Sequence, residues 1–99
     1  MKFYVGIARF RLDMAACSSL KDKRRLLKSI LDRLGNSKLM GAAEVGDRDY
    51  WKSGVLGITC VSSSRQLVDK ALDGARRLIE SSGVEVVDEE RWVLKPEDI

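Results

Sequence analysis

Histidine is absent from the 99 residues of this chain, and proline occurs once, at Pro96. Without histidine, acid–base catalysis by an imidazole is impossible, and zinc sites that use histidine cannot form. The two cysteines, Cys17 and Cys60, are too far apart in the sequence for the common spacings of zinc ligands. Glycine-rich phosphate loops of the G-x-x-x-x-G-K type are also missing. We therefore expect a protein that is not an enzyme and that uses no metal and no cofactor.

Long hydrophobic runs are missing as well. No segment approaches the roughly 20 consecutive apolar residues that span a bilayer, so we expect no membrane partner. Arg9 interrupts the apolar start of the chain too early for a signal peptide. These features predict a cytoplasmic protein whose two thiols are reduced.

The composition is that of a small folded protein. Hydrophobic residues make up 44% of the chain and charged residues 33%, and 99 residues suffice for one core, so we expect a single domain over residues 1–99. The formal charge of +3 is only mildly basic. Such a charge favours a polyanionic partner only where the cations cluster.

Hydrophobic periodicity predicts six elements. An alternating pattern predicts a strand over residues 2–14, and helical spacing predicts a helix from Ser19 to the Gly35-Asn36 stop. A second helix is expected from Ser63, with Gln66 at capping-box spacing, to Gly83. Further strands are predicted over residues 38–45, 54–62 and 84–87, the last open to extension through residues 92–94. This order predicts an α+β, ferredoxin-like two-layer sandwich (βαββαβ), with two helices on one face of a four-stranded antiparallel sheet.

The first helix begins with a concentration of positive charge. Ser19 and Asp22 have the spacing of a capping box, which fixes the helix start and so the direction of each later side chain. On a helical wheel, four cations fall within an arc of roughly 100°: Lys21, Arg24, Arg25 and Lys28. This arc is either an ordinary solvated face or a surface that binds phosphates.

Lys23 falls instead in the middle of the apolar arc of this helix. A lysine there needs a carboxylate, and Glu44 is the expected partner, which favours a structural ion pair over a catalytic lysine. Glu44, Asp47 and Asp49 also form an acidic group that a hard cation would suit, although turns are commonly rich in such residues.

The sheet face without helices is expected to be apolar, with Arg9 and Arg11 at its rim. We predict that this face joins two copies of the chain, while a ligand or another protein stays an alternative cover. Base stacking is not expected, because the third strand carries no aromatic residue. The predicted dimer face consists of Phe3, Val5, Ile7, Val55, Thr59 and Val61.

Four segments together resemble the YlxP-like family of small bacterial proteins, a domain-of-unknown-function family. They are Val5-Gly6-Ile7, the stretch from Ser19 to Arg25, Ala43-Glu44-Val45 with Asp49 and Trp51 after it, and residues 57–62. The resemblance implies a ferredoxin-like fold. Through the family's usual setting among genes for ribosome maturation and translation initiation, it also implies a connection to RNA or the ribosome, but no established activity. Residues 38–41 depart from the more aromatic or β-branched family pattern, which leaves the register of the second strand open.

The leading hypothesis is a non-enzymatic, homodimeric protein that docks on RNA or a ribonucleoprotein. Phosphate contacts would come from the four cations of the arc, with Arg9 and Arg11 assisting. The alternative is a small-molecule-binding or regulatory module with a pocket at the sheet-face dimer interface. An enzyme ranks third and would depend on Lys23, Glu44 and Asp49 meeting in space.

Overall fold

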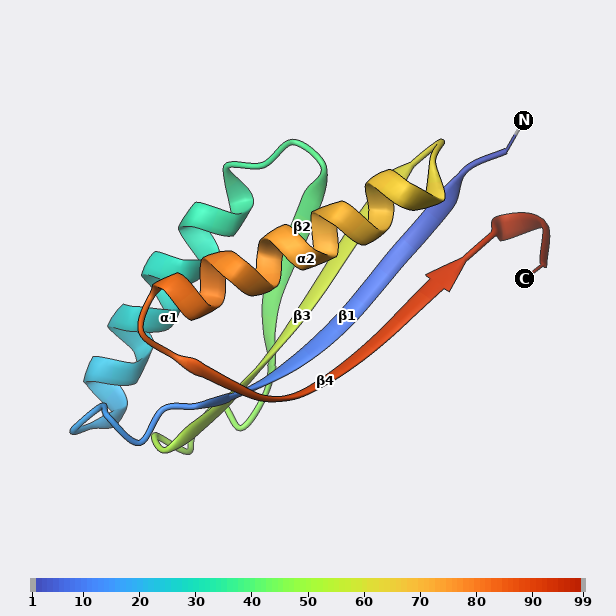
Figure 1. Cartoon of the computed structure of the whole chain (residues 1–99). Coiled ribbons are helices and arrows are strands. Elements are labelled where there is room, and N and C mark those ends of the chain that lie inside the picture. The colour runs from blue at the N-terminus through green and yellow to red at the C-terminus, as the bar shows by residue number, and fades with distance from the viewer. Residues whose placement is uncertain (1, 99) are drawn as a thin grey trace.

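The chain folds into two layers, an antiparallel sheet and two helices that cover one of its faces (Figure 1). The computed structural model describes residues 2–98. In chain order the elements are β1 (Tyr4–Asp13), α1 (Leu20–Gly35), β2 (Met40–Gly46), β3 (Ser53–Ser62), α2 (Arg65–Ser81), β4 (Glu85–Leu94) and the short 3₁₀ helix η1 (Pro96–Asp98). The sheet has four strands in the order β2-β3-β1-β4. The predicted ferredoxin-like sandwich is confirmed, with β1 and β3 at the centre.

Strand β1 separates the two faces of the sheet by alternation. Ala8, Phe10 and Leu12 are completely buried and face the helices, whereas Arg9 and Arg11 between them are exposed on the other side. Burying one large apolar side chain stabilises a fold by about 1.5–3 kcal/mol. The helices add Leu27, Ile30, Leu34, Val68, Leu72, Ala75 and Ile79 to this core. The core thus lies on the helix side of the sheet. None of the described helices is long and apolar enough to cross a bilayer.

Each helix begins at a serine cap. Ser19 Oγ accepts a hydrogen bond from Asp22 N at 3.1 Å, and Ser64 Oγ accepts one from Leu67 N at 3.4 Å. The second cap was predicted one residue too early, at Ser63. Any of several consecutive serines can cap a helix. Ser64 is the cap here, and the helix that begins after it places Val68 in the core.

All four strands differ from their predicted bounds, by one or two residues at the ends of β1, β2 and β3 and chiefly at the C-terminal end of β4. Strand β2 begins at Met40 rather than at residue 38, because the chain turns there and Met40 N donates to Ser37 O. Strand β4 continues without interruption to Leu94, but its register with β1 shifts at Val87. An extra residue of this kind is a β-bulge, which breaks the apolar alternation from which the strand was predicted.

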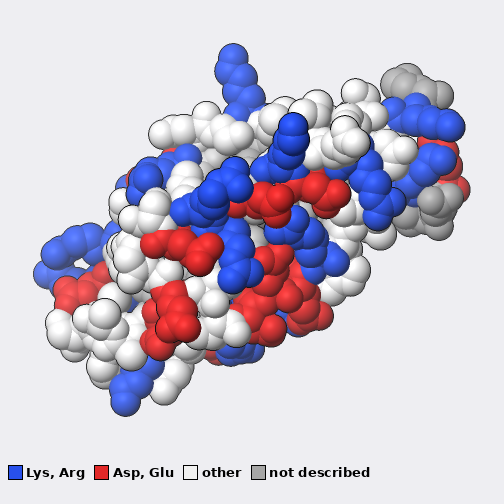
Figure 2. Space-filling model, in the orientation of Figure 1, with Lys and Arg blue, Asp and Glu red and all other residues white. Residues whose placement is uncertain are grey.

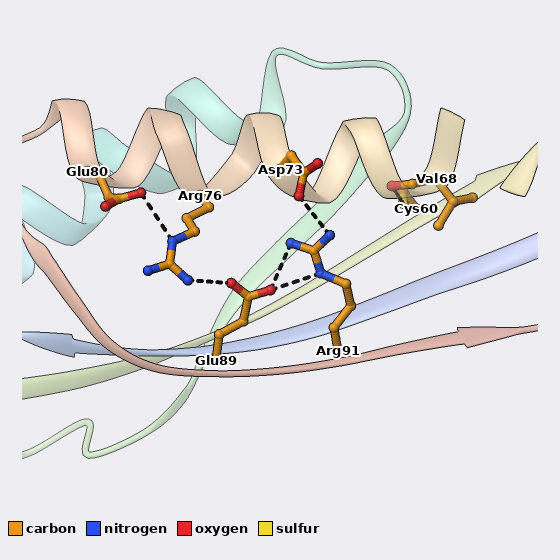
Figure 3. Close-up of polar contacts among 7 residues, drawn as sticks. All are labelled: Cys60, Val68, Asp73, Arg76, Glu80, Glu89 and Arg91. Carbon is orange, nitrogen blue, oxygen red and sulfur yellow. Dashed lines mark hydrogen bonds and ion pairs between the residues drawn. The ribbon is translucent and has the colours of Figure 1, made fainter. Parts of the chain in front are cut away.

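A charged network joins α2 to β4 beneath the second helix (Figure 3). Arg76 Nη1 lies 2.7 Å from Glu89 Oε1, and Arg91 Nη2 lies 2.7 Å from Glu89 Oε2. Arg91 also donates to Asp73 Oδ1 at 2.8 Å, and Arg76 donates to Glu80 Oε1 at 3.2 Å. The hydrogen bond with Glu89 raises the pKa of Arg76. The network thus fixes the edge strand β4 against the helix layer by paired charges.

Candidate functional site

The start of α1 is held by reciprocal contacts of Ser18, Ser19 and Asp22. Ser19 caps the helix as predicted, but the Asp22 carboxylate turns to Ser18 rather than back to Ser19. It accepts hydrogen bonds from both the backbone N–H and the hydroxyl of Ser18. These bonds from Ser18 hold the pKa of Asp22 below its ordinary value. The predicted capping box is therefore half formed, and Ser18, which the sequence prediction missed, completes the cap.

Lys23 is completely buried beneath the same helix turn. Its Nζ donates to the carbonyl oxygens of Asp47 and Tyr50, each at 2.5 Å, and lies 3.3 Å from Glu44 Oε2. The two carbonyls take hydrogen bonds from the ammonium group, and the Glu44 carboxylate balances its charge. The structure thus brings Lys23 and Glu44 together, and the two carbonyls show that Lys23 also fastens the β2–β3 turn to α1.

Glu44 and the neighbouring acids do not converge on one point. Among residues 2–98, no three histidine, cysteine or acidic side chains are placed to hold a metal ion. The Asp47 carboxylate accepts from Ser53 at 2.7 Å and from Arg11 at 3.2 Å, while Asp49 is almost fully exposed. Each acid therefore serves a different partner, and the turn composition accounts for their presence.

The four outward cations of α1 are all exposed, as the helical wheel predicted. Two of them have acidic neighbours: Arg24 Nη2 lies 3.8 Å from Asp49 Oδ1, and Lys28 Nζ lies 3.1 Å from Asp32 Oδ2. Within residues 2–98, no carboxylate forms an ion pair with Lys21 or Arg25. We call these four residues the basic face of α1: Lys21, Arg24, Arg25 and Lys28.

Arg9 and Arg11 do not join the basic face of α1. Both extend from β1 on the side of the sheet opposite the helices, because odd-numbered residues of this strand point away from the core. Arg9 is paired with Glu90, and Arg11 with Asp47. Their charges are therefore balanced locally, and they lie apart from the helix cations with which the sequence prediction grouped them.

A polar pocket of about 270 Å³ lies beside the basic face, where α1 meets the β2–β3 turn. It is lined by Arg24, Glu44, Arg48 and Asp49. Arg48 was not predicted as a site residue; its position four residues after Glu44 in the turn was the available signal, and its Nε lies 3.9 Å from Glu44 Oε1. The pocket combines two guanidinium groups with two carboxylates, so its charge is close to balanced.

Acidic and basic side chains are interleaved over the face of the molecule seen in Figure 2. The free thiols of Cys17 and Cys60 add no reactive group, because burial raises the pKa of both. Lys23 is held by two carbonyl acceptors and by the Glu44 carboxylate, and it has no access to solvent. Among residues 2–98, Lys21 and Arg25 are thus exposed cations on α1 with no carboxylate in an ion pair.

The sheet face opposite the helices is largely apolar, and we call it the open face. Cross-strand pairing places Val5 beside Val61 and Ile7 beside Thr59, as expected. Val55 was predicted to belong to the dimer face but is only 6% exposed. It pairs with Arg11 on one side and with Gly46 on the other, and the ion pair between Arg11 and Asp47 lies beside it. Phe3 lies just before β1 and is 38% exposed. The prediction missed three exposed apolar residues here: Val45, Trp92 and Leu94.

The chain is similar to proteins of unknown function. Residues 5–91 match the family described as "Protein of unknown function (DUF503)". The uncharacterized protein YlxP of Bacillus subtilis (strain 168) is 36% identical over 77 residues, which cover 78% of this chain and 84% of that protein. The de novo designed protein Foldit4 has a TM-score of 0.51 at 15% identity, with 94% of both chains covered. Protein YJCS has a TM-score of 0.56 at 6% identity over 89% of this chain and 96% of that chain. At these identities, this chain resembles the two solved structures in fold alone.

Proposed function

This chain belongs to the family of proteins of unknown function DUF503, and on that premise we propose that it is a non-enzymatic, cytoplasmic protein that docks on RNA or a ribonucleoprotein. The basic face of α1 makes the contacts, and the protein acts as a homodimer joined through its open face. The cytoplasmic location is supported by the two free thiols, which a reducing compartment maintains.

One observation carries the proposal: Lys21 and Arg25 are exposed one helical turn apart, on a turn that is anchored from below by the buried Lys23. Residues four apart on a helix have Cβ atoms about 5–6 Å apart, so both cations can reach one phosphate backbone. Arg24 and Lys28 can exchange their exposed carboxylate partners for phosphates at little cost, since exposed ion pairs contribute about 0–1 kcal/mol. Such contacts position RNA without reading its sequence.

The proposal is tested by the salt dependence of binding to a fluorescent single-stranded RNA. The logarithm of the binding constant should fall linearly with the logarithm of salt concentration, with a slope of about −0.7 for each phosphate neutralised. The double variant Lys21→Gln/Arg25→Gln should weaken binding and make the slope shallower by about 1.4. Lys70→Gln/Arg77→Gln, which removes two exposed cations from α2, is the matched control. Absence of binding at low salt, or equal affinity of the two double variants, would reject the proposal.

A second candidate function is a small-molecule-binding or regulatory module. The observation in its favour is an apolar groove of about 400 Å³ on the open face, lined in part by Ile7, Ala43 and Thr59. A ligand that binds the folded state raises the melting temperature as its concentration increases. A metabolite that does so where sulfate does not would favour this candidate over phosphate docking.

A further inference from the structure

The open face changes from bulky to hollow across a single row of paired residues. Ile7 pairs with Trp92 on one side and with Thr59 on the other, and Thr59 pairs with Gly41. The row therefore carries the largest side chain on edge strand β4 and no side chain at all on edge strand β2. Trp92 is 43% exposed on this surface.

The hollow side of the row is the groove of about 400 Å³. Its depth depends on glycine: a Cβ atom at Gly57 would lie 3.0 Å from Val45 Cγ1, and one at Gly41 would lie 3.2 Å from Thr59 Cγ2. Ala43, which pairs with Gly57, adds only a methyl group. A large, mostly apolar side chain from outside the molecule is what such a space accommodates.

We infer that the groove receives Trp92 of a second copy, in a dimer whose two-fold axis runs parallel to the strands. This arrangement rests on the homodimer in the proposed function and specifies its geometry. The rotation places β4 of each copy over β2 of the other, so each Trp92 meets the partner's groove at the level of the same row. The contact is isologous, with the same two features used twice.

The size of the open face fits a second copy. Four strands about 4.8 Å apart and about eight residues long at about 3.3 Å each present roughly 500 Å² of flat area. Two such faces in contact remove about 1,000 Å² from water, the level at which specific interfaces begin. We therefore expect a dimer that dissociates at low protein concentration.

The charges of the open face also favour a second copy over RNA. Arg9 is neutralised by Glu90 and Arg11 by Asp47, so two identical faces can approach without repulsion between unpaired cations. Gly57, which pairs with Arg9, leaves space for the partner's Arg9 side chain above it. A polyanion gains less here than on the basic face of α1, where Lys21 and Arg25 have no carboxylate partner among residues 2–98.

The test is the molar mass in solution, measured by light scattering from micromolar to millimolar concentration. The wild type and Leu67→Ala, which removes an exposed leucine from α2, should reach twice the monomer mass. Trp92→Ala, which removes the projecting side chain, and Ala43→Phe, which fills the groove, should both stay monomeric. Circular dichroism establishes whether each variant is folded. If Trp92→Ala does not fold, Ala43→Phe alone tests the interface.

A second measurement follows Trp92 itself. Trp51 is the other tryptophan of the chain, so Trp51→Phe leaves Trp92 as the sole emitter. Its emission should shift to shorter wavelength, and its quenching by acrylamide should decrease, as concentration rises.

The possible failures are distinguishable. A wild type that is monomeric at millimolar concentration overturns both the dimer and this interface, whereas RNA binding by α1 is measured separately. A dimer that persists in both Trp92→Ala and Ala43→Phe, with Trp92 emission unchanged, overturns the interface alone.

Discussion

Lys23 Nζ and Glu44 Oε2 lie 3.3 Å apart, and the lysine side chain is completely buried while that of Glu44 is 18% exposed. Glu44 Oε2 itself is inaccessible and makes no well-aligned hydrogen bond, so its contact with Lys23 is electrostatic. The ammonium group donates its hydrogen bonds to the two backbone carbonyls of the β2–β3 turn. The pair thus joins α1, β2 and this turn into one unit.

Replacing Lys23 with methionine should destabilise the protein by about 3–5 kcal/mol, because the buried Glu44 Oε2 would lose its cation and the carbonyls of Asp47 and Tyr50 would lose their donor. Urea unfolding measures the loss. Lys28→Met, at an exposed position of the same helix, should change stability by at most about 0.5 kcal/mol. The double variant Lys23→Met/Glu44→Leu should recover part of the loss, and additive effects of the two changes would show that the pair is not coupled.

Ser18→Ala should make the protein less resistant to acid. In the folded protein the pKa of Asp22 is below its ordinary value, so its contribution to stability is present above the ordinary pKa and is lost as pH falls through the lowered one. Without the Ser18 hydroxyl, the Asp22 pKa should rise toward the ordinary value and acid unfolding should begin at higher pH. NMR titration and circular dichroism measure the two effects. Ser29→Ala, at an exposed site on α1, should leave both unchanged.

Asp49→Asn should strengthen RNA binding. The substitution releases Arg24 from its exposed carboxylate partner, a contact of the class that contributes about 0.2–1 kcal/mol, so affinity should increase by about 1.4-fold to fivefold. Asp88→Asn removes the same charge from an exposed residue of β4 and serves as the control for net charge. Equal gains from the two variants would indicate that overall charge, rather than the basic face of α1, determines affinity.

Two glycine substitutions should have opposite effects. A Cβ atom at Gly6 would lie 2.4 Å from Val68 Cγ1 and 2.9 Å from Cys60 Sγ, so Gly6→Ala overpacks the core and should cost about 1–3 kcal/mol. At Gly74 in α2 the nearest atom, Arg77 Nη2, is 3.8 Å away, so Gly74→Ala should stabilise the helix by up to about 1 kcal/mol. Thermal unfolding of both variants measures the difference, and a stabilised Gly6→Ala would contradict this packing of β1 against α2.

The sequence predicted the fold because its local signals agree with one another. The alternating pattern of β1 predicts that Phe10 faces the core, and the helical spacing of α1 predicts the same for Lys23. Both side chains are buried in the structure. Contacts between side chains and backbone were beyond reach, since the carbonyls of Asp47 and Tyr50 leave no mark in the sequence. The open-face position of Trp92 was missed for another reason: the bulge at Val87 changes the alternation of β4.

The bulge and the charges of β4 have a consequence for how copies of this protein can accumulate. An unprotected edge strand invites a strand from another molecule, which is a route to aggregation. Glu89 and Arg91 of this edge strand point toward α2 and form ion pairs there with Arg76 and Asp73. A strand added beside β4 would place its own side chains next to these paired charges. Growth of the sheet by strand addition is therefore obstructed on this side, and a concentrated solution of the protein should remain free of fibrils that extend from β4.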